Sequence, residues 1–259
     1  MTESRQLIRP MDMISVFFRS FLIQASWSFD RMQSLGFAFA MLPALRRLYP
    51  DPEEFRSRLK LHMEYFNTQP YLASFILGAA VRTEEERASG RNRTVDVSAI
   101  KNRLMAPLGA LGDSFFWGAL KPLSVTIAAA VLATGAWWAP LLFLVLYNSW
   151  HVWLRADLLV WGYHSAGDVV SLIGRYRFTR MARLFKSVSL AVLGAMLAVL
   201  CLWTPGFQLL GSAPVAVNAA IALLVTLALV MALARKGSPV KLMLGLAAVC
   251  IGLAYAGVV

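Results

Sequence analysis

Three long stretches without any charged residue dominate the second half of the chain. Residues 122–154, 187–234 and 242–259 contain no Asp, Glu, Lys or Arg. A helix needs only about 20 predominantly apolar residues to cross a bilayer, and runs of about this length are typical of membrane spans. We therefore expect an integral membrane protein. The 48-residue run is long enough for two spans, and the prolines and glycines of 204–214 predict the turn between them.

The composition excludes an ordinary soluble domain. Hydrophobic residues make up 58% of the 259 positions and charged residues only 15%, against about 45–50% and about 25% in soluble proteins. The net charge of +11 could suggest nucleic acid in a soluble protein. Here the cations lie at the ends of apolar runs, so membrane orientation and anionic lipids explain them and we expect no nucleic-acid partner.

Basic residues predict the topology. The segments 175–186 and 235–241 are basic and free of acids, which favours a cytoplasmic position for both and an external C-terminus. One helical face of 175–186 is apolar, which suits a helix at the lipid surface; its residues are Phe178, Met181, Ala182 and Phe185. In 122–154, the sequence GAWWAP at 135–140 predicts a bend, so we expect a tilted span or a re-entrant helical hairpin.

The first half differs, and we divide the chain into regions 1–121 and 122–259. Apolar runs at 32–45, 65–81 and 104–120 are short or interrupted by Gly, Pro and Asp113. Irregular backbone at membrane depth is tolerated where protein buries it or where it lines a cavity. The expected fold is all-α, with transmembrane helices, re-entrant or broken helices and amphipathic interfacial helices.

A capped helix precedes the most unusual polar segment. Asp51 is the expected N-cap, followed by Pro52, and the pattern predicts a helix as far as Phe66. His62 lies on its apolar face, where a hydrogen-bonded structural role is favoured over a ligand role. Glu64 follows Lys60 by four residues, so a surface ion pair is the alternative to a binding role. Residues 82–96 are expected to form a charged solvent loop.

The segment NTQP at 67–70 is the strongest candidate for binding. Pro70 removes a backbone donor and biases Gln69 away from helical geometry. Carboxamides both donate and accept hydrogen bonds, as sugar hydroxyls do, so Asn67, Thr68 and Gln69 suit a neutral polyhydroxylated ligand. The alternative is an ordinary helix end in which these side chains satisfy the backbone.

Two further segments carry candidate residues. A helix over 24–37 would place Trp27 where it could stack on a sugar, with Asp30 and Gln33 as hydrogen-bonding neighbours; an interfacial anchor is the alternative for Trp27. Asp113 lies among apolar residues and glycines, so it is expected either to pair with a cation or to line a functional path. No metal site, cofactor motif or phosphate loop is recognisable, and we expect no catalytic residue.

Three strings carry a family resemblance: SWSFDRMQSLGFAFAMLPALRRLYP at 26–50, HMEYFNTQPYLASFILG at 62–78 and MAPLGALGDSFFWGALKP at 105–122. They closely resemble the IID component of the mannose/fructose/sorbose family of the bacterial phosphoenolpyruvate-dependent sugar phosphotransferase system. The resemblance covers nearly the whole chain.

The resemblance implies a multi-pass subunit of the bacterial inner membrane. IID and a second membrane protein, IIC, would form the translocator of a hexose, as an oligomer of IIC–IID pairs with an elevator-like motion. Soluble IIA and IIB would carry phosphate, and IIB would phosphorylate the sugar, leaving IID without enzymatic activity. Carried over by position, Asn67, Thr68 and Gln69 become the signature cluster near the sugar. The family's other signature helix would contain Trp27, Asp30, Arg31 and Gln33.

Two other functions remain open from the sequence. IID could be a structural or regulatory subunit that supports IIC without binding sugar itself. A membrane transferase acting on lipid would need a cytoplasmic cluster of acids or histidines. The single acidic run, Glu84 to Glu86, lies among arginines and is expected to be solvated.

Overall fold

The computed structural model describes residues 7–92, 95–165, 168–203 and 238–255, with isolated positions between 214 and 231. Every regular element in these residues is helical. The chain forms two compact units, Met1–Ser189 and Leu190–Val259. The change of composition at residue 121 does not coincide with this division.

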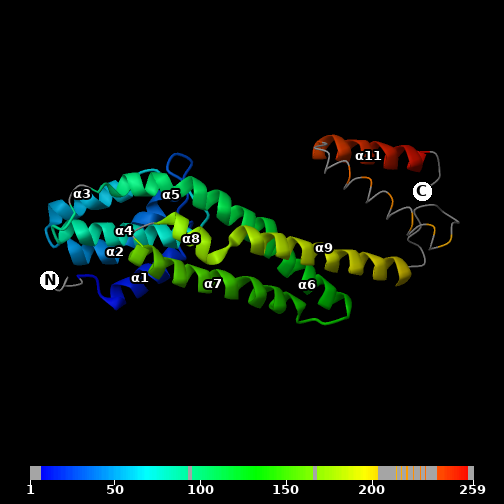
Figure 1. Cartoon of the computed structure of the whole chain (residues 1–259), viewed down its shortest axis with the longest axis horizontal. Coiled ribbons are helices and arrows are strands. Elements are labelled where there is room, and N and C mark those ends of the chain that lie inside the picture. Colours follow the sequence, from blue (N-terminus) through cyan, green and yellow to red (C-terminus); the bar gives the residue numbers. More distant parts are fainter. Residues whose placement is uncertain are drawn as a thin grey trace. The chain divides into compact units, whose positions relative to one another are not determined.

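The first unit is a bundle of helices (Figure 1). Its elements are α1 (Pro10–Ser20), α2 (Ser34–Leu48), α3 (Pro52–His62), α4 (Ala73–Ala88), α5 (Val97–Gly112), the π-helix η1 (Asp113–Leu120), α6 (Lys121–Ala133), α7 (Ala139–Ser165), α8 (Val169–Tyr176) and the start of α9 (Phe178–Trp203). The second unit contains the rest of α9 and α11 (Pro239–Tyr255). The predicted turn at 204–214 lies almost entirely outside the described residues.

Helices α5, η1 and α6 follow one another without a break. Val97–Ala133, with 37 residues, is the one helix among the described residues that is long and apolar enough to cross a membrane. The interrupted run at 104–120, where a re-entrant or broken helix was expected, is therefore part of one continuous helix. Pro107 and the glycines are accommodated inside the helix, and the chain passes from α to π geometry at Asp113 instead of turning back.

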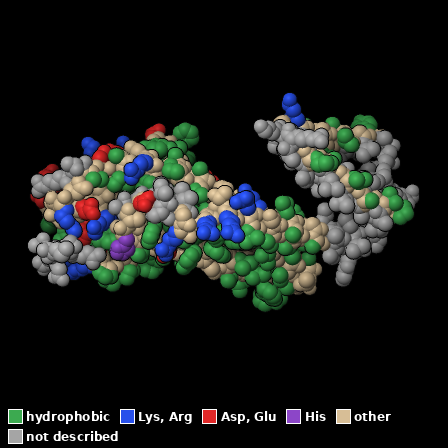
Figure 2. Space-filling model, viewed as in Figure 1, with side chains coloured by type: hydrophobic (Ala, Val, Ile, Leu, Met, Phe, Trp, Pro, Cys, Tyr) green, Lys and Arg blue, Asp and Glu red, His purple; other side chains and the backbone are tan. Residues whose placement is uncertain are grey.

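The predicted bend in 122–154 is confirmed as a helical hairpin. Helix α6 ends at Ala133, Gly135 adopts a left-handed φ of 86°, and α7 begins at Ala139. Hydrophobic side chains gather over this end of the unit (Figure 2). Trp137 is 85% exposed there, a surface that suits lipid or a partner rather than water.

Helices α4 and α7 touch through glycine. A Cβ atom built on Gly78 would lie 2.1 Å from the carbonyl oxygen of Leu159, and one on Gly162 would lie 2.1 Å from that of Phe75. Small residues at a crossing let two helix backbones approach closely, as is common in membrane proteins. Any side chain at either position would force the helices apart.

The amphipathic start of α9 packs against protein. Phe178 and Ala182 are buried, and Met181 and Phe185 are partly buried against the core. Phe115 of η1 lies 5.2 Å from Phe178 between ring centroids. The apolar face of residues 178–185 therefore packs against aromatic side chains of η1 and α7 in the described part of the chain, and it does not face lipid.

Candidate functional site

The NTQP segment forms one wall of a groove of about 550 Å³. We call it the NTQ groove. Its polar lining side chains come from four segments: the turn before α2, the NTQP loop, α5 and η1. The lining residues are Gln24, Gln33, Tyr65, Asn67, Thr68, Gln69, Pro70, Asn102, Met105, Ala106, Gly109, Ala110, Asp113 and Trp117.

Paired hydrogen bonds hold the NTQP loop in place. Gln33 Nε2 donates to the carbonyl oxygen of Thr68 at 2.8 Å, and Gln33 Oε1 accepts from the Thr68 backbone N–H at 3.2 Å. The Thr68 hydroxyl donates to the carbonyl oxygen of Met105 at 2.9 Å. Gln33 and Thr68 therefore use these groups to position the loop, between α2 and α5.

Two glycines of α5 let the helix approach the loop. A Cβ atom on Gly112 would lie 2.6 Å from both Cβ and Cγ of Gln69, which is well inside van der Waals contact. At Gly109 the nearest atom, Oγ1 of Thr68, would be 3.7 Å away. The sequence signalled these glycines as helix breakers, whereas their role is to accommodate Gln69 and Thr68.

Gln69 has an unused donor. Its Oε1 accepts the backbone N–H groups of Tyr71 and Leu72, at 2.8 and 3.1 Å, just before α4 begins. Because both of these bonds require an oxygen, the orientation of the amide is fixed and Nε2 points elsewhere. Nε2 is buried and has no hydrogen-bond partner in the described part of the chain. An unsatisfied buried donor of this kind costs about 1–3 kcal/mol unless a ligand or partner accepts from it.

The groove also offers free polar and aromatic groups. Asn67 and Asp113 are exposed, and neither side chain makes a hydrogen bond or ion pair with the residues that the structure describes. Trp117 is 42% exposed and lines the groove together with Tyr65. Sequence reasoning missed these two aromatic residues, although the spacing of Trp117 from Asp113, four residues on a helix, indicated a shared face.

Trp27 and Asp30 lie outside the groove lining. The helix predicted over 24–37 is wrong for its first ten residues, because residues 24–33 are not helical and α2 begins at Ser34. Met32 has a left-handed φ of 52° and pairs with Ser28 in an isolated bridge. This turn keeps Gln24 and Gln33 at the groove and leaves Trp27 half-exposed beside Phe29.

His62 and Glu64 also lie outside the groove lining. Helix α3 begins as predicted, with Asp51 accepting the backbone N–H of Glu54 at 2.8 Å, but it ends at His62. Glu64 accepts a hydrogen bond from Ser98 Oγ at 2.6 Å. His62 Nε2 is 2.8 Å from Glu84 Oε1 and fully buried, as the structural interpretation of this histidine predicts.

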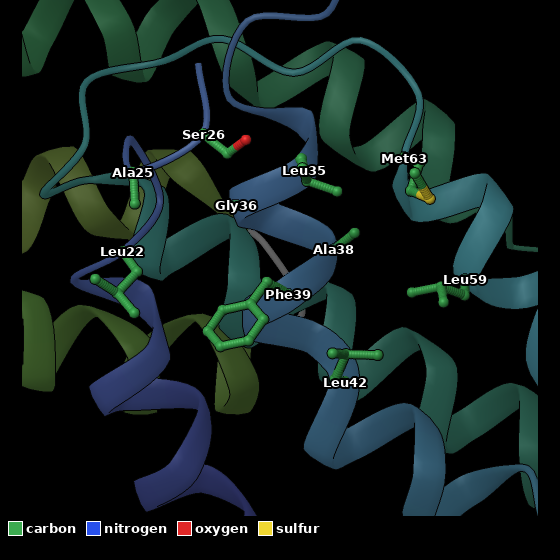
Figure 3. Close-up of a pocket in the computed structure, with 10 residues that line it drawn as sticks. All are labelled: Leu22, Ala25, Ser26, Leu35, Gly36, Ala38, Phe39, Leu42, Leu59 and Met63. Atoms are coloured by element: carbon green, nitrogen blue, oxygen red, sulfur yellow. The ribbon is translucent and has the colours of Figure 1, made fainter. Parts of the chain in front are cut away.

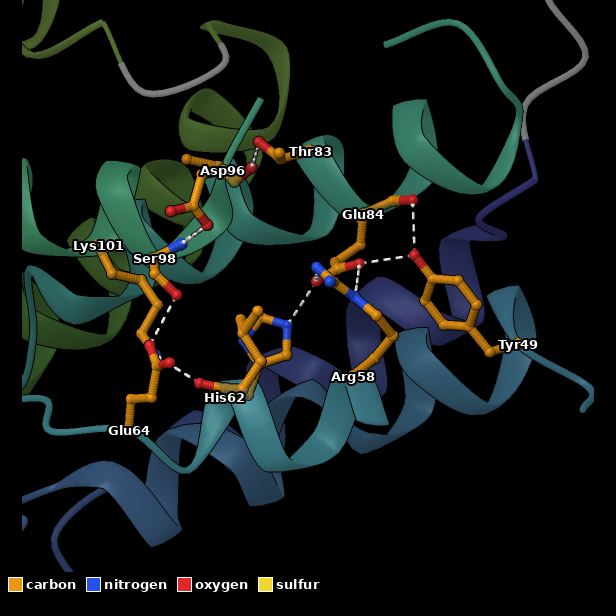
Figure 4. A network of polar contacts seen from close by, with 11 residues as sticks. Tyr49, Arg58, His62, Glu64, Thr83, Glu84, Asp96, Ser98 and Lys101 are labelled. Atoms are coloured by element: carbon orange, nitrogen blue, oxygen red, sulfur yellow. Dashed lines mark hydrogen bonds and ion pairs between the residues drawn. The ribbon is translucent and has the colours of Figure 1, made fainter. Parts of the chain in front are cut away.

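Glu84 and Glu85 are buried, contrary to the prediction of a solvated run. Arg58 holds Glu84 with two bonds, at 2.6 and 3.0 Å, and Tyr49 donates to it at 2.6 Å (Figure 4). Burial alone would raise the pKa of Glu84, but the hydrogen bonds from His62, Arg58 and Tyr49 prevail and lower it to about 2. Residues 82–88 are thus the last turns of α4 and not a loop.

Glu85 holds the chain segment just before α1 in place. Its carboxylate accepts the backbone N–H groups of Leu7 and Ile8, at 2.7 and 3.0 Å, and the hydroxyl of Tyr163. The acidic run therefore joins α4 to α3, α7 and the chain before α1. These bonds account for the acids structurally, so the run does not provide the exposed cluster that a transferase would need.

A second groove, of about 410 Å³, is apolar (Figure 3). It lies between the end of α1, the following turn, α2 and α3, and Leu22, Leu35, Phe39 and Leu59 are among its lining residues. Among the lining residues that the structure describes, Ser26 has the one polar side chain. It offers little hydrogen bonding to a sugar.

Comparisons with known proteins agree with this architecture. Residues 8–259 match the family model for the PTS system mannose/fructose/sorbose family IID component. The mannose-specific EIID component of Escherichia coli (strain K12) is 38% identical over 199 residues, covering 75% of this chain and 70% of that protein. The sorbose-specific EIID component of Klebsiella pneumoniae is 32% identical over 188 residues, 71% and 68% of the two chains.

Two solved structures match almost the full length. A chain of the cryo-EM structure of the mannose transporter ManYZ with microcin E492 is 32% identical, with a TM-score of 0.60, and 98% of this chain and 99% of that chain are covered. A second structure, described as a membrane protein, is 31% identical with a TM-score of 0.71 and the same coverage. The chain therefore belongs to the IID components of the mannose/fructose/sorbose phosphotransferase family and is a multi-pass transport subunit of the inner membrane.

Proposed function

We propose that this IID subunit binds a hexose in the NTQ groove jointly with IIC, as part of the translocation pathway. The buried, unpartnered Nε2 of Gln69 carries the proposal. A fixed donor without an acceptor, next to the free carboxamide of Asn67, suits a ligand rich in hydroxyl groups.

An aromatic wall supports a sugar over other neutral ligands. The C–H faces of a hexose pack against flat aromatic rings, and Trp117 and Tyr65 are both among the residues that line the groove. Trp117 takes the stacking role that the sequence suggested for Trp27. Gln33 and Thr68 act by holding the loop, whereas His62, Glu64 and Asp30 have no contact with the sugar in this proposal.

The groove is partly open in the single chain, so IIC would complete it. The sugar would be mannose, fructose or sorbose, the substrates in the names of the relatives. Soluble IIB, loaded by IIA, would phosphorylate it. We expect a hetero-oligomer of IIC–IID pairs in contact with anionic lipids.

The test measures sugar binding to the purified IIC–IID complex by calorimetry, with mannose, fructose and sorbose as ligands. Asn67→Leu and Gln69→Leu each remove donors that the sugar would use. Each lost pairing costs about 1–3 kcal/mol, which lowers affinity about tenfold to hundredfold. Glu64→Gln is the control, because Glu64 bonds to Ser98 away from the groove.

Stability measurements separate binding from folding. Gln69→Leu also removes the two bonds to the start of α4, so its complex should melt at a lower temperature, whereas Asn67→Leu should melt like the wild type. If both variants copurify with IIC and bind sugar with wild-type affinity, IIC holds the sugar alone and this chain is a supporting subunit.

A further inference from the structure

Among the described residues that line the NTQ groove, Asp113 is the one that carries a charge. It lies in the long apolar helix Val97–Ala133, and its side chain is exposed. No described residue pairs with its carboxylate. Carboxylates in membrane helices are costly and are usually retained for a function.

Helix geometry turns Asp113 and Trp117 toward the groove. Both belong to η1, where the backbone N–H of Lys121 reaches the carbonyl oxygen of Phe116, five residues earlier. The following residue, Pro122, has no N–H to continue the ladder. Short π segments often occur at functional sites because they displace side chains from the ordinary helical register.

Two cations lie near η1 without lining the groove. Lys121 Nζ lies over the Trp117 ring, 5.2 Å from its centroid, and Lys186 lies near Gly118. Neither lysine lines the groove. Arg31 donates instead to the carbonyl oxygen of Met63 at 3.5 Å. The described part of the groove therefore presents one negative charge among neutral donors, acceptors and aromatic rings.

We propose that Asp113 makes the NTQ groove selective by charge: it admits neutral hexoses and repels their phosphate esters. The proposal rests on sugar binding in this groove. A sugar phosphate carries a charge of about −1.5 to −2 at neutral pH, so it is repelled by Asp113 wherever it sits in the groove. The phosphorylated product would thus leave the site and compete poorly with incoming sugar.

The experiment compares two affinities in the wild-type IIC–IID complex and in Asp113→Asn, at 50 mM and 500 mM salt. The ligands are mannose and mannose 6-phosphate, or fructose and fructose 6-phosphate if the complex prefers the ketose. The readout is the affinity for the neutral sugar divided by the affinity for its phosphate ester. Removing the charge should lower this ratio about fivefold, as expected for a phosphate of charge about −1.5 to −2 that lies about 8 Å from a carboxylate in a largely aqueous groove.

Two further variants keep the result specific. Asp113→Glu should restore the wild-type ratio, and Glu53→Gln, which removes an exposed charge outside the groove, should leave it unchanged. High salt should lower the affinity ratio of the wild type, because it screens the repulsion by Asp113, but it should not change the ratio of Asp113→Asn. An unchanged ratio in Asp113→Asn would overturn the proposal, as would an equal narrowing in Glu53→Gln.

Failure of the sugar site itself gives a different pattern. If Gln69→Leu and Asn67→Leu bind sugar normally, the NTQ groove is not the site and the charge proposal falls with it. If those variants bind weakly while Asp113→Asn keeps the wild-type ratio, the sugar site stands and the charge selection alone is refuted.

Discussion

Replacing Gly112 by alanine should damage the groove, whereas the same change at Gly109 should not. The new methyl group at 112 would lie 2.6 Å from Cβ and Cγ of Gln69 and 3.0 Å from Cδ1 of Leu72. Overpacking of this kind costs about 1–3 kcal/mol. Alanine recovers about 0.5–1 kcal/mol through its higher helix propensity, so the net destabilisation should reach about 2 kcal/mol.

Gly109 is the matched control on the same helix. Its added methyl group meets Thr68 at 3.7 Å, an ordinary contact, so the propensity gain remains and the complex should become slightly more stable. Thermal unfolding and calorimetric sugar binding of both IIC–IID variants test this. Gly112→Ala should lower the melting temperature and weaken sugar binding about tenfold by displacing Gln69. Equal melting temperatures and equal affinities would refute the close approach of α5 to the loop.

Three other predictions concern the aromatic wall, the buried acid and the topology. Trp117→Ala should weaken sugar binding in the IIC–IID complex about tenfold, whereas Trp27→Ala should bind like the wild type, because only Trp117 lines the groove. The pKa of Glu84 is lowered from 4.5 to about 2, so the ionised carboxylate stabilises the fold by about 3 kcal/mol above pH 4.5, and this stabilisation is lost as the pH falls toward 2. The melting temperature of the complex should therefore fall over this pH range, and it should depend less on pH in Glu84→Gln. Alkaline phosphatase fused after Val259 should be active, because the basic segment 235–241 favours an external C-terminus. An inactive phosphatase fusion together with a bright fluorescent-protein fusion would instead place the C-terminus in the cytoplasm.

Local signals in the sequence identified some elements correctly. The cap at Asp51 and the bend after Ala133 depend on a few neighbouring residues, and both are present in the structure. The NTQP segment was singled out because Pro70 restricts the backbone beside it, and it does line a groove. These features are predictable because their causes lie within about five residues.

Features with distant causes were not predictable. The buried Glu84 has partners that lie 22 to 35 residues earlier in the chain. Arg58 and His62 contact it from α3, and Tyr49 contacts it from the end of α2. The turn at 28–32 depends on a left-handed Met32, and methionine gives no local warning of that conformation. A charge pattern alone cannot tell a solvated acid from one whose partners lie on another helix.

The glycine contact between α4 and α7 has a mechanical consequence. Backbones that touch at Gly78 and Gly162 leave no layer of side chains to deform, and Tyr163 ties α7 to Glu85 one residue beyond Gly162. Helix α4 also starts three residues after Pro70, so the NTQP loop is attached directly to this pair. In an elevator-like transport cycle the loop, α4 and α7 should travel as a single rigid part, and the hinges should lie elsewhere in the chain.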